Sequence, residues 1–445
     1  MNRLLLPWLA SAILLGAADQ SWWLSYGDSQ LNTLVDKALA QNLDLRAATQ
    51  RIAAARAVAA TSRSALLPAV NFTTGAQRLR GGFQQGIARI PEAPGETQGG
   101  AFVAPFETNI LQAGLDMRWE LDLFGGNRAA LAASRADVEA GEQLRQDLAI
   151  TISAEVARAY AEVRGIEERI AITERNRDAQ RDLLDLTKSR AEAGLALHLD
   201  VERQTTLLAN TEAVLPALAN ERAVRLNRLA VLTGETRIAV ERATQPLQTP
   251  PLATTVDAAV LRRRPDVRAA DARLQAALAR LQSARTDRYP KIVLNGLSGR
   301  QGTSFAGLSL GGGNFFSIGP QLQLPLFSGG RIRANINRND ALVEEARTRY
   351  QQEILIAFEE AENAIAGYRE QQARTAKLQD ALQAAERALA LSEDRNQAGL
   401  DDFLAVLDAQ REVFQAQLQH VEAHTSALVE SVRLYKALAG GWPQP

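Results

Sequence analysis

Two of the three histidines in this chain stand one helical turn apart, which is the spacing of a helical zinc site. His420 and His424 could present both imidazoles to one ion if this segment is a helix. A metalloprotease helix also carries a glutamate directly after the first histidine, but here Val421 follows and Glu422 comes one position later. The sequence offers no evident third ligand, so we expect neither a metal ion nor another cofactor.

The other residue types that support catalysis also lack the required spacing. The glycine clusters Gly81-Gly82 and Gly311-Gly312-Gly313 do not open onto the lysine and serine or threonine of a phosphate-binding loop. There is no cysteine, and no nucleophile stands beside a base. A net charge of -1 gives no electrostatic reason to bind nucleic acid. We therefore expect a protein that is not an enzyme.

The dominant feature of the sequence is an internal duplication. Residues 121–126 match residues 324–329 at an offset of 203, and residues 193–195 match residues 398–400 at an offset of 205. Nine residues return 222 positions later: Asp44, Arg46, Ala47, Ala48, Arg51, Ala54, Ala55, Arg63 and Pro68 match Asp266, Arg268, Ala269, Ala270, Arg273, Ala276, Ala277, Arg285 and Pro290. Because the signatures keep their order, the chain is predicted to contain two copies of one supersecondary unit.

The duplication gives a predicted domain organisation. An apolar stretch behind Arg3 is too short to cross a bilayer as a helix, and small residues follow it, as in a secretory signal peptide. Each copy is predicted to contain a helix, a β-hairpin and a long helix pair. The predicted boundaries are 1–18 for the signal peptide, 19–233 for repeat 1, 234–255 for a linker, 256–439 for repeat 2 and 440–445 for a tail.

Long helices are expected in both copies, because aromatic residues make up only 5% of the chain while Ala, Leu, Arg, Gln and Glu are abundant. Residues 31–67 are predicted to be helical, in one piece or in two pieces around Asn42. Residues 127–193 contain no proline and would span about 100 Å as one helix. Long helices of this composition need partners along most of their length.

Shorter second helices are predicted at 199–232 and 401–438, and Pro216 should kink or break the first of them. In the second copy, an alanine-rich seam recurs at gaps of three and four. Its members are Val343, Ala346, Tyr350, Ile354, Ala357, Ala361, Ala364 and Tyr368. So narrow a stripe buries little surface per helix, which predicts several helices packed side by side.

Residues 111–123 carry the strongest strand signal. Every second residue is apolar, and Asp116, Arg118 and Glu120 lie among the residues between. Such alternation places one face of a strand in an apolar medium and the other in water. Residues 316–326 repeat the alternation in the second copy. A half-buried sheet in a soluble domain would also alternate, but the charged face and the small number of strands favour a wet lumen.

Partner strands are predicted at 70–80 and from Ile292 onward, with hairpin loops at 81–105 and 302–313. Strands exposed to lipid must close into a barrel, because no water is present to satisfy their edges. About eight strands is the practical minimum for closure, and each chain supplies four. The barrel is therefore expected to be shared between subunits.

Taken together, these motifs resemble one known family. The turns at 123–126 and 326–330, the segments 263–267 and 404–410 and the two-fold repeat resemble the outer membrane factors of tripartite efflux pumps. The resemblance is to the OprM/NodT-type branch of the TolC superfamily and covers residues 22–438. It implies a trimeric α/β-barrel channel, mainly α, with four strands and long antiparallel helices per subunit, in which twelve strands form the membrane barrel.

The resemblance also implies function, partners and location. The expected protein is a passive exit duct for drugs or other small molecules, placed in the Gram-negative outer membrane and extending into the periplasm. Its expected partners are two further copies of itself, a periplasmic membrane fusion (adaptor) protein, an inner-membrane pump of which the RND type is favoured, and outer membrane lipid. The exported substrate, the pump class and the adaptor are not given by the sequence.

The family assigns roles to the two turns between long helices. Gly194 and Gly399 can adopt the left-handed conformation that a tight reversal needs. In the family such turns form the periplasmic tip where the adaptor docks. The expected docking residues are therefore Gly194, Leu195, Gly399 and Leu400. They serve equally well as simple helix-hairpin turns.

The family also places its narrowest point near this tip. Leu404, Asp408 and Arg411 share one helix face and would form rings in a trimer. A leucine ring closes a pore by dewetting, an aspartate ring favours cations, and Arg411 could pair with a neighbouring helix. Arg395 and Asp200 are weaker gate candidates. A solvated helix face is the simpler explanation of the same pattern.

Two departures from the family and one competing class stay open. Ala17 stands where a lipobox would carry an acylated cysteine, so this sequence offers no lipidation site there. Around Arg395 only that residue is charged, whereas the family usually carries an aromatic or basic pair, which leaves the latch undefined. A periplasmic coiled-coil scaffold or adaptor without a pore would explain the helices, although not the alternating strands.

Overall fold

The computed structural model describes residues 21–84, 103–242, 247–250, 262–305, 308–400 and 403–438. The expected signal peptide and tail lie outside the described residues, as does part of the expected linker. The chain divides into two compact units. Unit one contains Met1–Ile52, Glu139–Asp271 and Thr348–Pro445, and unit two contains Ala53–Val138 and Ala272–Arg347.

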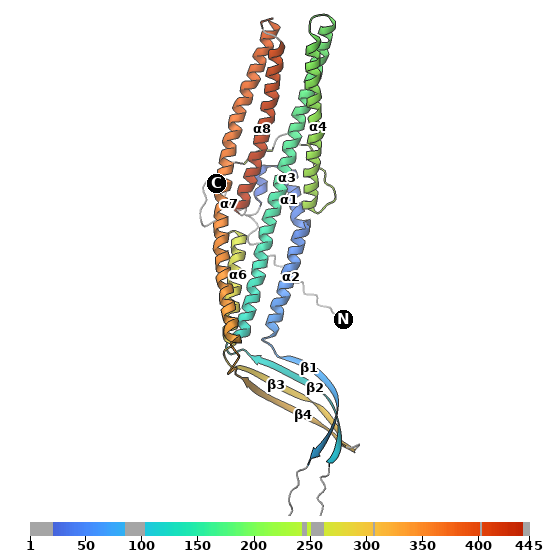
Figure 1. The fold of residues 1–445 in the computed structure, drawn as a ribbon, viewed down its shortest axis with the longest axis vertical. Helices are drawn as coiled ribbons and strands as arrows, with labels where there is room; N and C mark the ends of the chain where they lie inside the picture. Colours follow the sequence, from blue (N-terminus) through green and yellow to red (C-terminus); the bar gives the residue numbers. More distant parts are fainter. Residues whose placement is uncertain are drawn as a thin grey trace, which may run out of the picture. The chain divides into compact units, whose positions relative to one another are not determined.

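Both copies contain the same order of elements, namely helix, two strands, a helix of 67 residues and a shorter helix (Figure 1). A short 3-10 helix, η2 (Trp22–Tyr26), precedes them. The first copy contains α1 (Ser29–Gln41), α2 (Leu43–Ser64), β1 (Ala69–Gln84), β2 (Val103–Leu121), α3 (Gly126–Glu192) and α4 (His198–Thr233). The second contains α6 (Pro265–Thr286), β3 (Lys291–Phe305), β4 (Leu308–Gln323), α7 (Arg331–Gln397) and α8 (Phe403–Ala437). Within the described residues, no helix is long and apolar enough to cross a membrane.

Helix α4 continues through Pro216, so the helix is not broken there, and the alternative outcome, a kink, stays a prediction. Proline removes a backbone hydrogen bond and costs about 3 kcal/mol in a helix interior. Leu215 and Leu218 lie on either side of it and pack with Ile166 and Ile170 of α3. Burying each such side chain contributes about 1.5–3 kcal/mol, which offsets the loss.

The alanine-rich seam of α7 is buried as predicted over most of its length. Ala357, Ala361, Ala364 and Tyr368 are at most 1% exposed and belong to a cluster that includes residues near the end of α8. Ile354 is the exception, with 37% of its surface exposed. From Ala357 to Tyr368 the seam is therefore the packing face of α7 within unit one, and Val343 packs against α6 within unit two.

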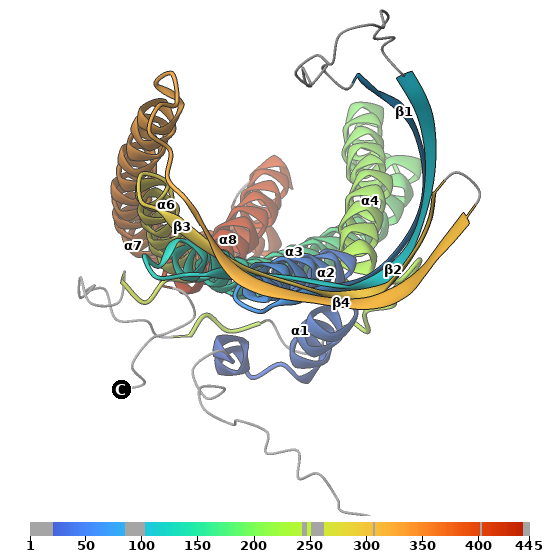
Figure 2. The same cartoon turned by 90° about the horizontal axis from the view of Figure 1, so that it is seen from below.

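The four strands of unit two form one antiparallel sheet in the order β1-β2-β3-β4, which is strongly curved (Figure 2). The strands extend further into the hairpins than the alternation predicted. β1 and β2 cover both ends of the predicted loop 81–105, and Gly302 and Gly311–Gly313 lie in strands instead of a loop. Gly302 pairs with Gly312, because glycine keeps its backbone donors and acceptors even though it adds no side-chain packing. At the other end, β2 stops at Leu121 and β4 at Gln323, short of the predicted ends.

The register of the sheet separates an apolar face from a polar face. On the polar face Asn71 donates to the carboxylate of Asp116 at 3.0 Å, and Asn295 donates to Gln321 at 3.0 Å. The apolar face carries side chains that are at least half exposed: Val70, Phe72, Leu111, Leu115, Phe316, Ile318 and Leu322. The predicted alternation is confirmed, and the apolar face is uncovered within the described chain.

Asn42 ends α1 and starts α2, so of the two possibilities that the sequence left open, the structure has two helices around Asn42. Its Oδ1 accepts hydrogen bonds from the backbone N–H groups of Asp44 at 2.8 Å and Leu45 at 3.2 Å, which caps α2. Its Nδ2 donates to the carbonyl of Leu232 at 2.9 Å. This one buried side chain therefore joins the first turn of α2 to the last turn of α4.

Arg264 makes the equivalent joint in the second copy with different chemistry. It stands 222 positions after Asn42 and donates to the carbonyl of Ala437, in the last turn of α8, at 3.1 Å. Its guanidinium also pairs with Asp266 at 2.6 Å and with Glu360 of α7 at 2.5 Å. The Arg264 side chain is 7% exposed, so these partners compensate a charge that burial would otherwise penalise.

We expect Arg264→Ala to reduce stability by about 3 kcal/mol, because it leaves a partly buried carboxylate and a buried carbonyl without their donor. The apparent melting temperature in mild detergent, followed by circular dichroism, measures this loss. Arg263→Ala is the matched control, since Arg263 is exposed and its loss should change stability by less than about 0.5 kcal/mol. Equal effects of both substitutions would contradict the stabilising role of Arg264.

Candidate functional site

The two turns between long helices have the same backbone structure. Gly194 and Gly399 have φ values of 73° and 69°, in the left-handed region. The N–H of Leu195 donates to the carbonyl of Arg190 at 2.7 Å, and that of Leu400 donates to Arg395 at 2.9 Å. These bonds satisfy carbonyls that the last helical turn leaves free. Leucines 195 and 400 are 79% and 69% exposed, so both turns present an apolar side chain at the equivalent position.

The gate candidates Leu404, Asp408 and Arg411 lie in the first turns of α8. All three are exposed, Leu404 at 45%. The guanidinium of Arg411 is 3.7 Å from the carboxylate of Asp408 on the same helix, one turn away. Both side chains are about 60% exposed, so this ion pair contributes little to stability and leaves both groups able to respond to a ligand or an ion.

Arg411 also lines a cavity of about 200 Å³ between α3, α4 and α8 of unit one. Gln180, Gln204 and Gln410 contribute amides to the lining, and Leu407 contributes an apolar side chain. Gln204 is 1% exposed and donates to the carbonyl of Gln180, while its own side-chain oxygen has no partner among the described residues. Nothing in the sequence singled out Gln204, because an isolated glutamine on a helix does not reveal its burial.

The weaker gate candidates occupy helix ends. Asp200 accepts a hydrogen bond from the N–H of Leu197 at 3.3 Å and lies 3.9 Å from Arg203. It therefore sits in the first turn of α4, where a carboxylate is favoured by the helix dipole. Arg395 is in the last turn of α7, where a basic residue is favoured for the same reason.

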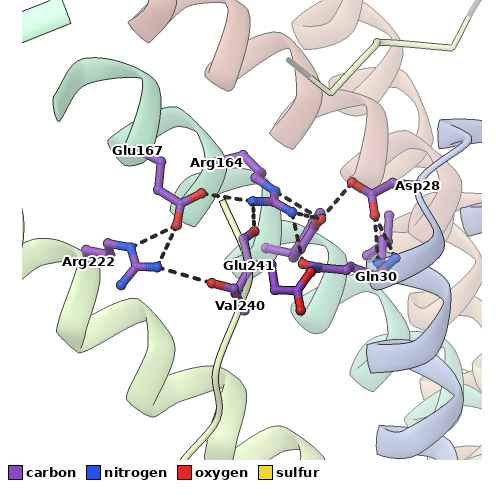
Figure 3. Close-up of polar contacts among 9 residues, drawn as sticks. Asp28, Gln30, Arg164, Glu167, Arg222, Val240 and Glu241 are labelled. Carbon is purple, nitrogen blue, oxygen red and sulfur yellow. Dashed lines mark hydrogen bonds and ion pairs between the residues drawn. The ribbon is translucent and has the colours of Figure 1, made fainter. Parts of the chain in front are cut away.

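A buried polar network on α3 was not predicted from the sequence (Figure 3). The guanidinium of Arg164 donates to the Tyr160 hydroxyl, to Glu167, to Gln30 and to the backbone carbonyl of Glu241. Its side chain is 8% exposed. One cation therefore joins α1, α3 and the segment that follows α4.

Further hydrogen bonds connect these residues to Asp28 on one side and to Arg222 and Val240 on the other (Figure 3). The Tyr160 hydroxyl donates to Asp28 at 2.6 Å, and burial raises the pKa of this tyrosine, so it remains a donor. Glu167 accepts from Arg222 of α4 at 2.6 Å, and Arg222 also donates to the carbonyl of Val240 at 3.3 Å. Asp28 is 132 positions from Tyr160, and Gln30 is 134 positions from Arg164, so sequence spacing gave no signal for these two contacts.

The histidine pair lies on α8. The rings of His420 and His424 are stacked with centroids 6.4 Å apart, and burial lowers the pKa of both. Across the described ranges, no cluster of three or more His, Cys, Asp or Glu side chains is arranged to hold a metal ion. The pair therefore packs as two neutral rings on one helix face at neutral pH.

The chain is similar to known proteins over nearly its whole length. The model of a family described as outer membrane efflux protein matches residues 34–235 and 258–440. The pyoverdine export outer membrane protein OpmQ of Pseudomonas aeruginosa is 33% identical over 95% of this chain and 88% of its own. The toluene efflux pump outer membrane protein TtgF of Pseudomonas putida is 31% identical, covering 96% and 86%. Among solved structures, the outer-membrane channel OprN is 32% identical with a TM-score of 0.82, covering 95% and 93%.

We expect Arg164→Leu to loosen the segment that contains Val240 and Glu241, because the carbonyl of Glu241 loses its donor. Trypsin should then cleave after Arg237 or Arg242 faster than in the unmodified protein, as measured by mass spectrometry of timed digests. Arg169→Leu is the control, because its ion pair with Glu221 is partly exposed and does not contact the segment. Unchanged cleavage in Arg164→Leu would contradict a holding role for the network.

Proposed function

The chain belongs to the outer membrane efflux protein family and is an efflux channel of the outer membrane, and we propose that it is a passive duct gated at the start of α8. It is not an enzyme. Its fold is that of the family's trimeric α/β-barrel channels, mainly α, with four strands and long antiparallel helices per subunit. We infer that its partners are a periplasmic adaptor and an inner-membrane pump. The coiled-coil scaffold without a pore is excluded by family membership.

The four-stranded sheet is the observation that carries this function. Its apolar face is exposed, its polar face is hydrogen-bonded, and among the described residues no strand pairs with the outer edge of β1 or β4. An open edge in lipid costs several kcal/mol for each unsatisfied backbone group. Closure with the sheets of two further subunits satisfies every edge and directs the polar face toward the lumen. A barrel built in this way passes polar molecules without choosing among them.

We propose that Leu404, Asp408 and Arg411 line the constriction of the closed channel. Their exposure within one subunit supports this role, because side chains that line a pore contact water instead of a core. Three Asp408 carboxylates around a narrow axis would attract cations, and three Leu404 side chains would exclude water. Arg411, close to Asp408 and to the cavity shared with α4, is placed to couple the gate to movement of α4 against α8. Asp200 and Arg395 have helix-end contacts and are assigned a supporting role.

We propose that the adaptor docks on the turns at Gly194-Leu195 and Gly399-Leu400. The two turns share one geometry and each exposes a leucine, so a repeated partner could bind both in the same way. We also propose that the inner-membrane partner is a pump of the RND type. The relatives named for pyoverdine export and for toluene efflux differ in cargo, which fits a duct whose cargo is chosen by the pump.

The topology can be tested by labelling. We expect Ala88→Cys, in the hairpin between β1 and β2, to react with an impermeant thiol reagent on intact cells, and Leu400→Cys to remain unlabelled until the outer membrane is opened. The chain has no cysteine, so there is no background. Labelling of Leu400→Cys alone on intact cells would reverse the proposed orientation.

The gate can be tested by conductance. We expect Asp408→Ala with Arg411→Ala to raise single-channel conductance in planar bilayers by about twofold or more and to weaken cation selectivity, because the charged ring is removed at the narrowest point. Stability of the trimer should change little, since both groups are exposed. The matched control is Asp116→Ala with Arg118→Ala in the wide barrel, where conductance should change far less. Equal effects at both sites would place the constriction elsewhere.

A further inference from the structure

The cavity that Arg411 lines in unit one lies where the faces of two helices meet without filling the space between them. We call this space, of about 200 Å³, the α4–α8 cavity. Residues at gaps of three and four line it from both helices: Gln204, Leu207, Thr211 and Val214 of α4, and Leu407, Arg411 and Phe414 of α8. Such spacing places side chains on one helix face, where packed helices normally interlock. A water molecule takes about 30 Å³ of liquid volume, so the cavity is several times larger than a void for one water.

The cavity belongs to the first turns of α8 and not to a loosely packed helix. Farther along the same helix, α8 meets α3 closely, because a Cβ added to Gly165 would overlap the side chain of Thr425. Val421, Ala427 and Leu428 are at most 3% exposed in that stretch. The open space is therefore a local feature of the helix start.

The buried end of the cavity carries two side-chain oxygens without a donor. Gln204 is 1% exposed, and its Nε2 donates to the backbone carbonyl of Gln180 at 3.3 Å. This hydrogen bond fixes the orientation of the amide, so its Oε1 is the atom left over. Among the described residues, neither this oxygen nor Oε1 of Gln180 has a hydrogen-bond partner, although both are buried. Buried acceptors normally have a partner, so an occupant of the cavity should bring hydrogen-bond donors.

The donors that suit these oxygens are neutral ones. Gln180, Gln204 and Thr211 contribute amides and a hydroxyl, and no carboxylate of the described residues lines the cavity. A protonated amine would be a buried charge without a counter-ion there. Arg411, by contrast, is exposed and only loosely paired with Asp408 at 3.7 Å, so its N–H groups suit a carbonyl oxygen. A carboxamide combines neutral N–H donors with such an acceptor.

The rest of the lining favours an apolar body next to that group. Leu207 and Val214 of α4 and Leu407 and Phe414 of α8 contribute hydrocarbon surface to the cavity. Water molecules beside these side chains would lack hydrogen-bond partners, whereas a ring or a branched chain would be removed from water by the contact. The cavity is therefore complementary to a small molecule with one polar end.

We propose that the α4–α8 cavity binds a small neutral carboxamide with an apolar body. Its N–H groups donate to Oε1 of Gln204 and Gln180, and its carbonyl oxygen accepts from Arg411. Its apolar part lies against Leu407 and Phe414. Such an occupant contacts both α4 and α8 and opposes their movement past each other. The site goes beyond the proposed gate, because binding does not require that Arg411 lines the constriction.

Protection of an introduced cysteine tests the site in the full-length protein purified in mild detergent, with benzamide as the probe. Val214→Cys places a thiol at the rim, where the valine is 36% exposed, and the chain has no other cysteine. We expect benzamide to slow alkylation of this thiol by N-ethylmaleimide about fivefold, with half of the effect at about 1 mM, because so small a ligand binds weakly. Val224→Cys is the matched control, since Val224 is 54% exposed on the same helix and outside the cavity lining. Its alkylation rate should be the same with and without benzamide.

Substitution of Gln204 tests the polar contact. Gln204→Leu in the Val214→Cys background removes the buried oxygen but keeps an aliphatic side chain, and it should abolish the protection. Gln383→Leu makes the same change at an exposed glutamine of α7 and should leave the protection intact. Protection that survives Gln204→Leu would overturn the site, as would an alkylation rate that benzamide does not change.

A comparison of probes decides the chemical class without any change at Gln204. Toluene and benzylamine keep the ring of benzamide but lack its carboxamide, and neither should protect the Val214→Cys thiol at the same concentration. Equal protection by toluene would mean that the cavity is an apolar crevice without polar recognition. Equal protection by benzylamine would mean that it accepts a cation. Either result would overturn the assignment of a carboxamide site while leaving the proposed channel and its gate untouched.

Discussion

The backbone hydrogen bonds at the two edges of the sheet are the constraint on which the rest of this structure depends. In the part of the chain that the structure describes, four strands leave the outer edges of β1 and β4 unpaired, and in lipid those backbone groups have no water to bind. The exposed apolar face of the sheet favours contact with lipid. Contact with lipid is also what makes unpaired backbone groups at the open edges unfavourable. A single chain cannot satisfy both requirements, because about eight strands are needed to close a barrel. Assembly is therefore part of folding for this protein.

The two copies contain the same order of helices and strands, and each supplies two of the four strands. Their side chains differ at equivalent positions where the surrounding residues differ. Asn42 and Arg264 stand at equivalent positions and bind equivalent carbonyls, at Leu232 and Ala437, yet one is a neutral amide and the other a guanidinium with two carboxylates. Asp137 of α3 pairs with Arg280 of α6, whereas the equivalent positions in the other copy are occupied by Leu342 and Val58. The backbone contacts are thus the same in the two copies, whereas the type of side chain at each position depends on its burial and on the group that it contacts.

Polar networks complement the thin apolar seams of the helices. Alanine contributes little buried area, so α7 gains only modest stability per turn from its seam. Arg164 and Arg264 are buried cations that join three elements each, and removing either would leave unpaired polar groups. By contrast, Asp408 and Arg411 are exposed and weakly paired. The buried arginines and the exposed ion pair at the start of α8 thus lie in different parts of the sequence.

The repeat, the very long helices, the alternating faces of the sheet and the left-handed turns at Gly194 and Gly399 could all be predicted from the amino-acid sequence, because they depend on local periodicity and on the conformational freedom of glycine. The sequence left open whether the helix divides at Asn42 and whether Pro216 breaks or only kinks α4. It placed the glycines of the β3–β4 hairpin in a loop, although cross-strand pairing keeps them in strands, just as packing by Leu218 keeps α4 continuous. The network of Asp28, Arg164 and Arg222, and the burial of Gln204, were decided only by tertiary structure, since their partners are distant in sequence and burial belongs to the fold as a whole.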